Sequence, residues 1–504
     1  MALAPDRPQR TEPIALTALA DEIGARVTGD ATGVQVTGFT LSSQRAFAGD
    51  LYAALPGSRS HGIFFAPAAV EAGAVAVLTD QDGADTTDLT VPLLVVDSPR
   101  AILGRTAARI YGEPARAMRM IGVTGTQGKT TTTLLAEGAM SAAGIPAGVI
   151  GTVGTRIAGE EVKTSLTTPE APDLHGLYAV MRERGIEVCA MEVSSHALVL
   201  GRVDGVVFDV AVFLNLGRDH LDFHADVDDY FAAKASLFTP ERARLALLNV
   251  DDEHGRRLAG EVTIPVRTMS SAGRAADWQA TGIDRTTSGS RFVVRAPDGA
   301  TFPAGCPLPG DFNVANALAA IAACGEAGLD AAAVAAGMAA GGSVPGRFEV
   351  VDSGQDFVVM VDYAHKPDAV EAAIRTLRPL TRGDVIVVLG AGGDRDPGKR
   401  PLMGEIAARL ADVLIVTDDN PRTEDPADIR AALLAGAAGG RAELVEVGDR
   451  RAAIAEAVRR ARTGDVVLVA GKGHETGQEI HGVVHPFDDR VVVREALQEL
   501  GAGR

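Results

Sequence analysis

The segment from residue 118 to residue 144 contains a strand, a glycine-rich loop and a helix in direct succession. The run MRMIGVTG is apolar enough for a buried strand, and the run KTTTTLLAEGAMSAAG follows the loop as a long helix. Further apolar strands are predicted at 186–193 and 206–216. Strands that alternate with helices imply a mostly parallel sheet. This part of the chain is therefore predicted to be an α/β domain built on a parallel sheet.

The whole chain is too long for one ordinary core. Its 504 residues suggest about three domains of roughly 100–200 residues each. Short apolar strands (DLYAAL, AVAVLTD, VPLLVVD) mix with helical stretches near the start, and a new series (FVVMVDYAH, DVIVVLGAGGDRD, ADVLIVTDDNPR, DVVLVAGKGHE) begins near residue 346. Each strand of the new series runs into a polar or glycine-rich loop, where open α/β sheets hold their ligands. The predicted domains are 1–115, 116–345 and 346–504, and the polar stretch 272–310 is interpreted as a hairpin that decorates the second.

The charge balance restricts the partners of the chain. Its formal net charge is −18, which disfavours a surface for nucleic acid or anionic membranes. The three cysteines are widely spaced and form no CxxC pair, so neither a disulfide framework nor a zinc site is indicated. The start MALAPDRPQRTEP has no apolar export core, and no run approaches the roughly 18 apolar residues of a membrane span. We expect a cytoplasmic protein without membrane insertion.

The run GVTGTQGKTTTT at 122–133 is the sharpest chemical signal. A glycine-rich turn between a strand and a helix lets backbone N–H groups face a phosphate, with Lys129 near the terminal phosphates and Thr130 placed for Mg²⁺. The strict GxxxxGK[ST] pattern fails, because position 123 is valine and the first glycine of the loop is Gly125. The alternative is an ordinary glycine-rich turn with a chance lysine, which the complete strand, loop and helix disfavour.

Three further polar residues follow the phosphate loop in the chain, and the first of them is a candidate metal ligand. Glu192 ends the apolar strand of CAMEVSSHAL, where an acid commonly holds Mg²⁺ in nucleoside triphosphatases. His220 lies just past the strand of VVFDVAVFLNL, and Lys234 lies on the next helix, about one turn from Tyr230 and Phe231. On spacing alone, His220 reads as a surface or capping histidine and Lys234 as part of a solvated helix face.

These segments together resemble the Mur ligases, the ATP-dependent amide-forming family that builds the peptide stem of the peptidoglycan precursor. In that family the phosphate loop is spelled G-T-x-G-K-[ST], as here at 125–130. Glu192 matches the acid of its E-x-S-S-H segment, and His220 matches the histidine of its N-L-x-x-D-H-L-D motif. Lys234 matches a lysine carboxylated by carbon dioxide, and a carbamate supplies Mg²⁺ with the hard anionic oxygen that an ammonium lacks.

The resemblance assigns roles by motif across nearly the whole chain. It implies a small N-terminal domain that binds a UDP substrate, a central ATPase-type domain and a C-terminal Rossmann-like domain that binds an amino acid. The implied metal ligands are Thr130, Glu192, His220 and Lys234 as carbamate. The implied catalytic residues are Lys129, Glu192, His220, Lys234 and Arg347. The implied ATP-binding residues are Gly125, Thr126, Gln127, Gly128, Lys129, Thr130, Thr131, Asn313, Arg347, Asp362 and His365.

Other segments resemble the branch of the family that adds the third residue of the peptide stem, namely LSSQRAFAGDLYAALPG, TTPEAPDL, GGDRDPGKRPLM and DNPR. The implied contacts to UDP-N-acetylmuramoyl-L-Ala-D-Glu are Ser43, Thr167, Thr168, Ser194 and Arg202. Many relatives carry glutamine where this chain has Leu200, which puts one substrate hydrogen bond in doubt. The implied diaminopimelate contacts are Arg395, Asp419, Asn420, Pro421, Arg422, Gly471 and Glu475. Arginine suits this amino acid, because its second carboxylate accepts a two-pronged bond; the alternative for Arg422 is a turn residue that pairs with Glu424.

The implied activity is a ligase that uses ATP and Mg²⁺ to make an acyl phosphate and passes the acyl group to an amine. We expect a monomer without a nucleic-acid partner. The alternatives are a lysine-adding ligase, folylpolyglutamate synthetase, which lacks the first domain, and a non-catalytic nucleotide-binding relative. Retention of Lys129, Glu192, His220 and Lys234 disfavours a sensor. The sequence gives less support to a dinucleotide oxidoreductase, because GAGGDRD does not match the GxGxxG pattern.

Overall fold

The structure, a computed structural model, describes residues 7–164, 166–340 and 344–502. The chain divides into two compact units. The first comprises Met1–Gln279, Val294–Thr301 and Asn316–Gly337; the second comprises Ala280–Val293, Phe302–Ala315 and Met338–Arg504. The predicted boundaries after residues 115 and 345 stay a prediction. No helix in the described ranges is both long and apolar enough to cross a membrane.

The first unit begins with a sheet in the order β2-β7-β6-β5-β4. Its strands are β2 (Arg26–Thr28), β4 (Gly38–Thr40), β5 (Asp50–Ala53), β6 (Ala76–Thr79) and β7 (Leu93–Val95). All neighbouring pairs are parallel except β2 with β7. The accompanying elements are β1 (Ile14–Ala15), β3 (Gln35–Val36), α1 (Leu16–Ile23), α2 (Ala66–Glu71), α3 (Gln81–Asp85), α4 (Pro99–Ile110) and the 3-10 turns η1 (Ser43–Arg45), η2 (Gly62–Phe65) and η3 (Pro114–Ala117). The three apolar runs expected as strands in this region are β5, β6 and β7, as predicted.

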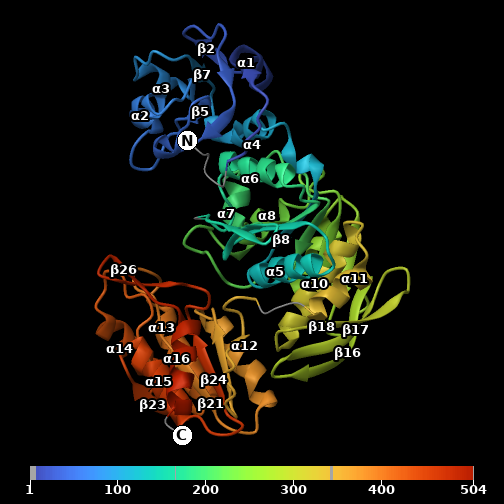
Figure 1. The fold of residues 1–504 in the computed structure, drawn as a ribbon, viewed down its shortest axis with the longest axis vertical. Helices are drawn as coiled ribbons and strands as arrows, with labels where there is room; N and C mark the ends of the chain where they lie inside the picture. The colour runs from blue at the N-terminus through green and yellow to red at the C-terminus, as the bar shows by residue number, and fades with distance from the viewer. Residues whose placement is uncertain (1–6, 165, 341–343, 503–504) are drawn as a thin grey trace. The chain divides into compact units, whose positions relative to one another are not determined.

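A second sheet carries the predicted strand, loop and helix (Figure 1). Its order is β11-β10-β9-β12-β8-β13-β14-β15, and all strands from β9 to β15 in this order run parallel. Its strands are β8 (Arg119–Thr124), β9 (Ala147–Gly151), β10 (Gly154–Ile157), β11 (Glu160–Val162), β12 (Val188–Glu192), β13 (Val210–Phe213), β14 (Ala246–Asn249) and β15 (Val266–Ser270). Helix α5 (Lys129–Ala142) packs on β9, β12 and β8. Parallel order brings the ends of β12, β8 and β13 together at one edge, since Glu192 pairs with Val123 and Phe213 with Thr124.

The remaining elements up to residue 340 lie between the strands of this sheet or follow them in the chain. The helices are α6 (Ala171–Glu183), α7 (Ser195–Val199), α8 (Val227–Ala235), α9 (Glu253–Glu261), α10 (Asp311–Glu326) and α11 (Ala331–Ala340). Strands β16 (Trp278–Thr286), β17 (Gly289–Arg295) and β18 (Thr301–Cys306) are hydrogen-bonded in that order. Alternate residues of β17 are buried and exposed, as expected for a ribbon with one solvated face. This ribbon is the predicted decoration at 272–310.

The second unit is built on a sheet in the order β19-β20-β24-β21-β22-β23. Its strands are β19 (Glu349–Val350), β20 (Val358–Asp362), β21 (Val385–Leu389), β22 (Val413–Val416), β23 (Glu443–Glu446) and β24 (Val466–Ala470), with a separate hairpin β25 (Gly477–Ile480) and β26 (Val483–Pro486). Only the β19–β20 pair of the main sheet is antiparallel. Every residue of β21 and β24 is buried, which is typical of parallel strands covered on both faces.

Helices complete the second unit (Figure 1). They are α12 (Pro367–Leu377), α13 (Lys399–Leu410), α14 (Pro426–Ala437), α15 (Arg450–Arg460) and α16 (Asp489–Ala502), with the 3-10 turn η4 (Arg378–Leu380). Ile454 of α15 and Val493 of α16 share one core with alternate strand residues such as Val359 and Val361. Helices α12, α13 and α14 pack on one another in series. The polar loops that follow β20, β21, β22 and β24 all leave the carboxyl ends of neighbouring parallel strands, as the sequence predicts.

Candidate active site

The phosphate loop joins β8 to α5 through four residues, of which the first and the last are glycines. Gly125 has φ +157° and Gly128 has φ +87°. A Cβ on Gly128 would lie 2.4 Å from Asn316 Oδ1, so both the backbone angle and the space require glycine there. The first N–H groups of α5 follow directly, and the first four N–H groups of any helix lack partners within it. This loop has the geometry of an anion-binding helix terminus.

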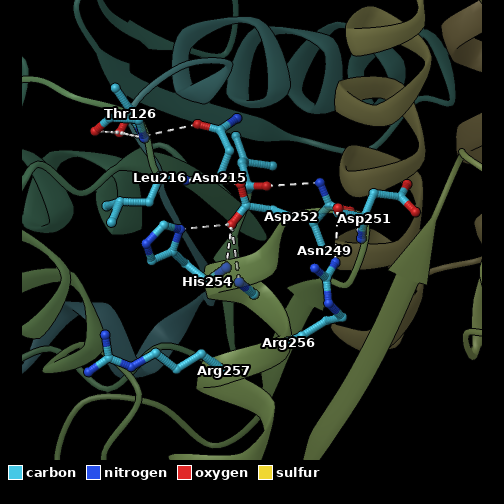
Figure 2. Close-up of polar contacts among 12 residues, drawn as sticks. Thr126, Asn215, Leu216, Asn249, Asp251, Asp252, His254, Arg256 and Arg257 are labelled. Carbon is cyan, nitrogen blue, oxygen red and sulfur yellow. Dashed lines mark hydrogen bonds and ion pairs between the residues drawn. The ribbon is translucent and has the colours of Figure 1, made fainter. Parts of the chain in front are cut away.

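Asn215, just past β13, fixes the shape of this loop (Figure 2). Its Oδ1 accepts hydrogen bonds from the backbone N–H groups of Thr126 (3.1 Å) and Gln127 (2.9 Å), and its Nδ2 donates to the carbonyl of Gln127 (3.1 Å). Asn249 lies behind it and donates to the carbonyl of Leu214 (2.9 Å). The side chain of Asn215 therefore pairs two backbone N–H donors and one carbonyl acceptor of the loop.

Two lysines meet at the first glycine of the loop. Lys129 Nζ donates to the carbonyl of Gly125 at 2.7 Å, and Lys234 Nζ donates to the same oxygen at 3.0 Å. Lys234 is 1% exposed, and its Nζ lies 4.4 Å from the centre of the Tyr230 ring. The interpretation of Lys234 as part of a solvated helix face is therefore wrong. The Lys129 ammonium places positive charge at this edge of the sheet, which suits polyphosphate.

Glu192 ends β12 beside the phosphate-loop strand. Its carboxylate accepts hydrogen bonds from the backbone N–H (2.7 Å) and the hydroxyl (3.2 Å) of Thr152. Its side chain fills the space above Gly151, where a Cβ would lie 2.3 Å from Glu192 Oε1. Because the residue is buried, it is not a solvated turn residue.

His220 belongs to an aromatic cluster. Its ring lies edge-on to His196 (centroids 4.8 Å apart) and to Tyr230 (6.0 Å), and His196 stacks on Phe223 (4.1 Å). Burial lowers the pKa of His196, and the neighbouring His224 lowers it further. His220 has φ +54° and a half-exposed side chain 3.3 Å from Asp219. In the described ranges, no three His, Cys, Asp or Glu side chains gather so that they could hold a metal ion.

The residues assigned to the UDP substrate lie next to Glu192, with one exception. Thr168 Oγ donates to the carbonyl of Glu192 (2.8 Å) and lies 3.5 Å from Ser194 Oγ. Arg202 donates to the carbonyl of Thr168 (3.3 Å), and Thr167 Oγ lies 3.0 Å from Thr152 Oγ. Thr167, Thr168, Ser194 and Arg202 therefore form one polar group.

The exception is Ser43, which lies in η1 of the N-terminal sheet region. Its neighbour Arg45 binds Asp173 in the first turn of α6 at 2.9 Å. This ion pair connects the turn that carries Ser43 to the segment that follows Thr168. The structure thus connects Ser43 with the polar group indirectly.

In the second unit, Asp362 at the end of β20 organises the first loop. Its carboxylate accepts hydrogen bonds from the N–H groups of Phe348 (2.9 Å) and Ala364 (2.8 Å). Burial raises the pKa of Asp362, and the nearby Arg347 opposes that shift. The Arg347 guanidinium lies 4.5 Å from the centre of the Tyr363 ring. Among the described residues, Arg347 Nε is buried without a hydrogen-bond partner.

His365 and Asn313 are held by main-chain carbonyls. His365 Nδ1 lies 2.7 Å from the carbonyl of Tyr363, and burial lowers the pKa of His365 to about 4. Its ring is thus neutral at physiological pH and carries its proton on Nδ1, because a carbonyl can only accept. Asn313 Nδ2 donates to the carbonyl of Pro309 at 2.7 Å.

The loop after β22 contains Asp419, Asn420, Pro421 and Arg422. Asn420 Nδ2 donates to Glu475 Oε2 at 2.8 Å, and a Cβ on Gly471 (φ +119°) would lie 2.4 Å from Asp419 Oδ2. Arg422 has φ +54° and donates to the carbonyl of Gly393 at 2.6 Å. The loops after β21, β22 and β24 therefore converge, as the sequence predicts. Arg395 lies on the first of them with an exposed side chain.

The alternative pairing of Arg422 with Glu424 is not formed. Glu424 instead accepts two hydrogen bonds from Arg400 of α13, both at 2.8 Å. Arg422 Nε lies 3.5 Å from Glu479 Oε2 of β25. Arg422 thus faces the hairpin and the loop after β21 rather than its own turn.

Several residues of these clusters are not among the predicted site residues. Asn215 and His224 lie within the predicted motif segment, and Lys472 and Tyr363 sit next to predicted residues. The signal available for Asn215 is its place directly after a buried strand, where site residues of α/β sheets lie. Lys472 offers a weaker signal, a lysine between two glycines in AGKGHE.

The fold and the site define a phosphate-loop α/β protein, with a second parallel-sheet unit whose polar loops also lie at the carboxyl ends of its strands. The chain belongs to the Mur ligase family. The Mur ligase middle domain matches residues 123–324, and the Mur ligase, glutamate ligase domain matches residues 346–473.

Similar proteins agree with this assignment. The chain is 54% identical over 501 residues to the UDP-N-acetylmuramoyl-L-alanyl-D-glutamate–2,6-diaminopimelate ligase of Streptomyces avermitilis, with 98% of each chain covered. A solved structure of a ligase of the same name is 33% identical, with a TM-score of 0.69 over 97% of this chain and 100% of that one. The MurF ligase of Thermotoga maritima in complex with ADP shares the fold (TM-score 0.60, 19% identity, 92% and 97% covered). The predicted three-domain α/β fold class is confirmed.

Proposed function

We propose that this chain is an ATP-dependent amide ligase of the MurE type, which joins diaminopimelate to UDP-N-acetylmuramoyl-L-alanyl-D-glutamate during synthesis of the peptidoglycan precursor. The observation that carries the proposal is the 54% identity with a diaminopimelate ligase over 98% of both chains. The site supports it, because the phosphate loop, the polar group around Glu192 and the arginine-bearing loop after β22 supply one place for each of three substrates.

The reaction proceeds in two steps. The γ-carboxylate of the D-glutamyl residue attacks the γ-phosphorus of ATP, whose bond to the β,γ-bridging oxygen breaks, so that ADP leaves and an acyl phosphate forms. The amine of diaminopimelate then attacks the acyl carbon, and inorganic phosphate leaves from the tetrahedral intermediate. Lys129 and the first N–H groups of α5 neutralise the phosphate charge, and the protein acts mainly by positioning and electrostatics.

The residues at the phosphate loop fit Mg²⁺ if Lys234 is carboxylated. The Thr130 hydroxyl and the Glu192 carboxylate offer the hard oxygen atoms that this ion prefers, and His220 offers an imidazole nitrogen. The Lys234 ammonium only donates hydrogen bonds, and as a carbamate it would supply the missing anionic oxygen. When bound, Mg²⁺ would neutralise charge on the transferred phosphoryl group. ATP and Mg²⁺ are thus part of the proposal, as are a cytoplasmic location and a monomeric state.

An amino-acid panel tests the proposed function. Purified protein is incubated with UDP-N-acetylmuramoyl-L-Ala-D-Glu, ATP and Mg²⁺, and phosphate release is measured with diaminopimelate, lysine and each remaining amino acid in turn. Phosphate release that requires both the UDP substrate and diaminopimelate is expected. Release with lysine alone would identify the lysine-adding type, and no release with any amino acid would identify a non-catalytic nucleotide-binding protein.

Replacing Asn215 should weaken ATP binding through the shape of the phosphate loop. Asn215→Ala removes three hydrogen bonds to Thr126 and Gln127, each contributing about 0.5–1.5 kcal/mol. We expect the KM for ATP to rise roughly tenfold or more. Asn249→Ala is the matched control, because Asn249 bonds the carbonyl of Leu214 and not the loop (Figure 2). Equal ATP KM values in the two variants would contradict a role of Asn215 in the loop.

Arg422 is expected to select diaminopimelate through its distal carboxylate. A charge-assisted hydrogen bond contributes about 1.5–3 kcal/mol, so Arg422→Ala should weaken use of diaminopimelate roughly ten- to a hundredfold. Use of lysine should fall little, or rise. The loss should appear mainly in the amino-acid KM, because the contact is remote from the reacting carbonyl.

Kinetics on both amino acids check this expectation. Arg441→Ala serves as the control, because Arg441 is exposed and donates to the carbonyl of Leu410. An equal loss for both amino acids would mean that Arg422 only supports its loop through Gly393 and Glu479.

A further inference from the structure

Lys472 is a fully buried lysine between two loops of the amino-acid site. It lies between Gly471 (φ +119°) and Gly473 (φ +54°), directly after β24. Its side chain is 0% exposed. An ammonium group is buried only where hydrogen bonds compensate for the water that it loses. Its partners therefore indicate what the chain uses it for.

Each of the three Nζ donors has an acceptor. Lys472 Nζ donates to Asn420 Oδ1 (3.0 Å), Glu475 Oε2 (3.1 Å) and the carbonyl of Gly477 (2.6 Å). An ammonium group has three donors, so this set uses its full capacity. Asn420 lies on the loop after β22 and Glu475 on the loop after β24. One cation thus ties together two loops that carry predicted diaminopimelate contacts.

The same bonds determine the orientation of the Asn420 amide. Its Oδ1 also accepts from the backbone N–H of Glu479 (3.0 Å), so two donors converge on this atom. The amide nitrogen must then face Glu475, to which Nδ2 donates at 2.8 Å. Lys472 and Asn420 both bind Glu475 Oε2, and among the described residues Glu475 Oε1 accepts no hydrogen bond. A carboxylate held by one oxygen offers the other to an ammonium group of a ligand.

We infer that Lys472 is a positioning residue for the amino-acid substrate, which acts by fixing the Asn420 amide and the Glu475 carboxylate without touching the substrate. This inference rests on the proposed function. Its chemistry suits diaminopimelate, whose two ammonium groups each need an anionic or carbonyl partner. Arg422 serves the carboxylate side of the same ligand, and Lys472 serves the ammonium side through Glu475.

The test compares the KM for the amino acid with the KM values for the other two substrates. Lys472→Met keeps an unbranched side chain that is one atom shorter and removes the charge. It should raise the KM for diaminopimelate roughly ten- to a hundredfold, the range for losing a charge-assisted hydrogen bond. The KM values for ATP and for the UDP substrate should change less than about threefold. Lys163→Met, at an exposed lysine, is the control for this type of substitution and should leave all three KM values unchanged.

A double-mutant cycle distinguishes positioning from general support of the fold. If Lys472 acts through Glu475, then adding Lys472→Met to Glu475→Gln should raise the KM for diaminopimelate only a few-fold further, because coupled residues are not additive. The double variant also lacks the partly exposed Glu475 carboxylate, which loses its cationic partner in Lys472→Met. Parallel increases of all three KM values, full additivity in the cycle, or an unchanged KM for diaminopimelate in Lys472→Met would each overturn the inference.

The amino-acid panel on the wild-type enzyme distinguishes failure of this inference from failure of the proposed function. If the wild-type enzyme uses a different amino acid, the proposed substrate is wrong, and the same cycle is run with the amino acid that it uses. A selective KM effect for that amino acid would still support the positioning role of Lys472. If the wild-type protein uses no amino acid, calorimetry measures the affinity for diaminopimelate in the wild type and in Lys472→Met instead of the KM. Equal affinities of the two proteins would overturn the inference.

Discussion

Lys129→Ala is expected to reduce ATP turnover to background while the fold stays intact. The Lys129 ammonium is the cation at the start of α5, and its Nζ already lies on the loop, 2.7 Å from the carbonyl of Gly125 and 3.3 Å from that of Thr126. Removing one preorganised donor that faces the developing charge typically costs roughly 10²- to 10³-fold in kcat. The remaining Lys234 cannot replace it, because the carbamate proposed on its Nζ is anionic.

Phosphate release with saturating substrates measures this loss, and thermal unfolding shows whether the fold is retained. Lys129 is only partly buried, so little change in Tm is expected. Lys163→Ala, at an exposed lysine of the same unit, controls for loss of one positive charge. Wild-type turnover in Lys129→Ala would contradict the assignment of 125–131 as the phosphate loop.

The fold could be predicted from the sequence to a large extent, because buried parallel strands appear in it as continuous apolar runs. VIVVL and VVLVA are buried along their whole length in β21 and β24, and each is followed by the polar loop that marks its carboxyl end. The convergence of Asp419, Gly471 and Arg395 at one sheet edge follows from parallel order alone. The order of the strands does not, since β24 lies between β20 and β21 although it is the last strand of this sheet in the chain.

Side-chain partners were harder to predict, because they depend on residues distant in the chain. Glu424 is close to Arg422 in sequence, yet Arg400 of α13 binds it. Asn215 contacts Gln127 across 88 positions. Lys472 reaches Asn420 across 52 positions. No local pattern contains such pairs, and the one local clue for Lys472, its two flanking glycines, indicates a special backbone and not a buried cation.

The burial of Lys234 is an exception to the usual solvation of helix lysines. A lysine on a helix is usually solvated. Tyr230 lies four positions before it, however, and residues four apart share one helix face. Tyr230, Phe231 and Lys234 are all buried, so the aromatic pair indicated the inner face of α8. Spacing could have placed Lys234 on that face, but only the structure shows that its Nζ reaches the carbonyl of Gly125.

Lys234→Ala is expected to be nearly inactive, with partial rescue by small carboxylates such as formate or acetate in the buffer. The motivation is the match of Lys234 to a carboxylated lysine and its position beside the phosphate loop. If a carbamate on Nζ supplies oxygen to Mg²⁺, its removal leaves space of the right size and polarity for a small carboxylate, which presents the same pair of anionic oxygens. A purely structural lysine would not respond to added carboxylate.

The controls come from the neighbouring helix. Arg257 lies 4.2 Å from the centre of the Phe231 ring, much as Lys234 lies against Tyr230, but it is exposed. Arg257→Ala removes a cation from an aromatic face without touching the phosphate loop, so it should keep its activity and show no response to carboxylate. Rates are measured across a series of formate concentrations, with chloride at equal ionic strength as the reference salt. Full activity of Lys234→Ala without added carboxylate would exclude the carbamate, and inactivity that no carboxylate relieves, together with a lowered Tm, would leave Lys234 as a support for the loop through Gly125 and Tyr230.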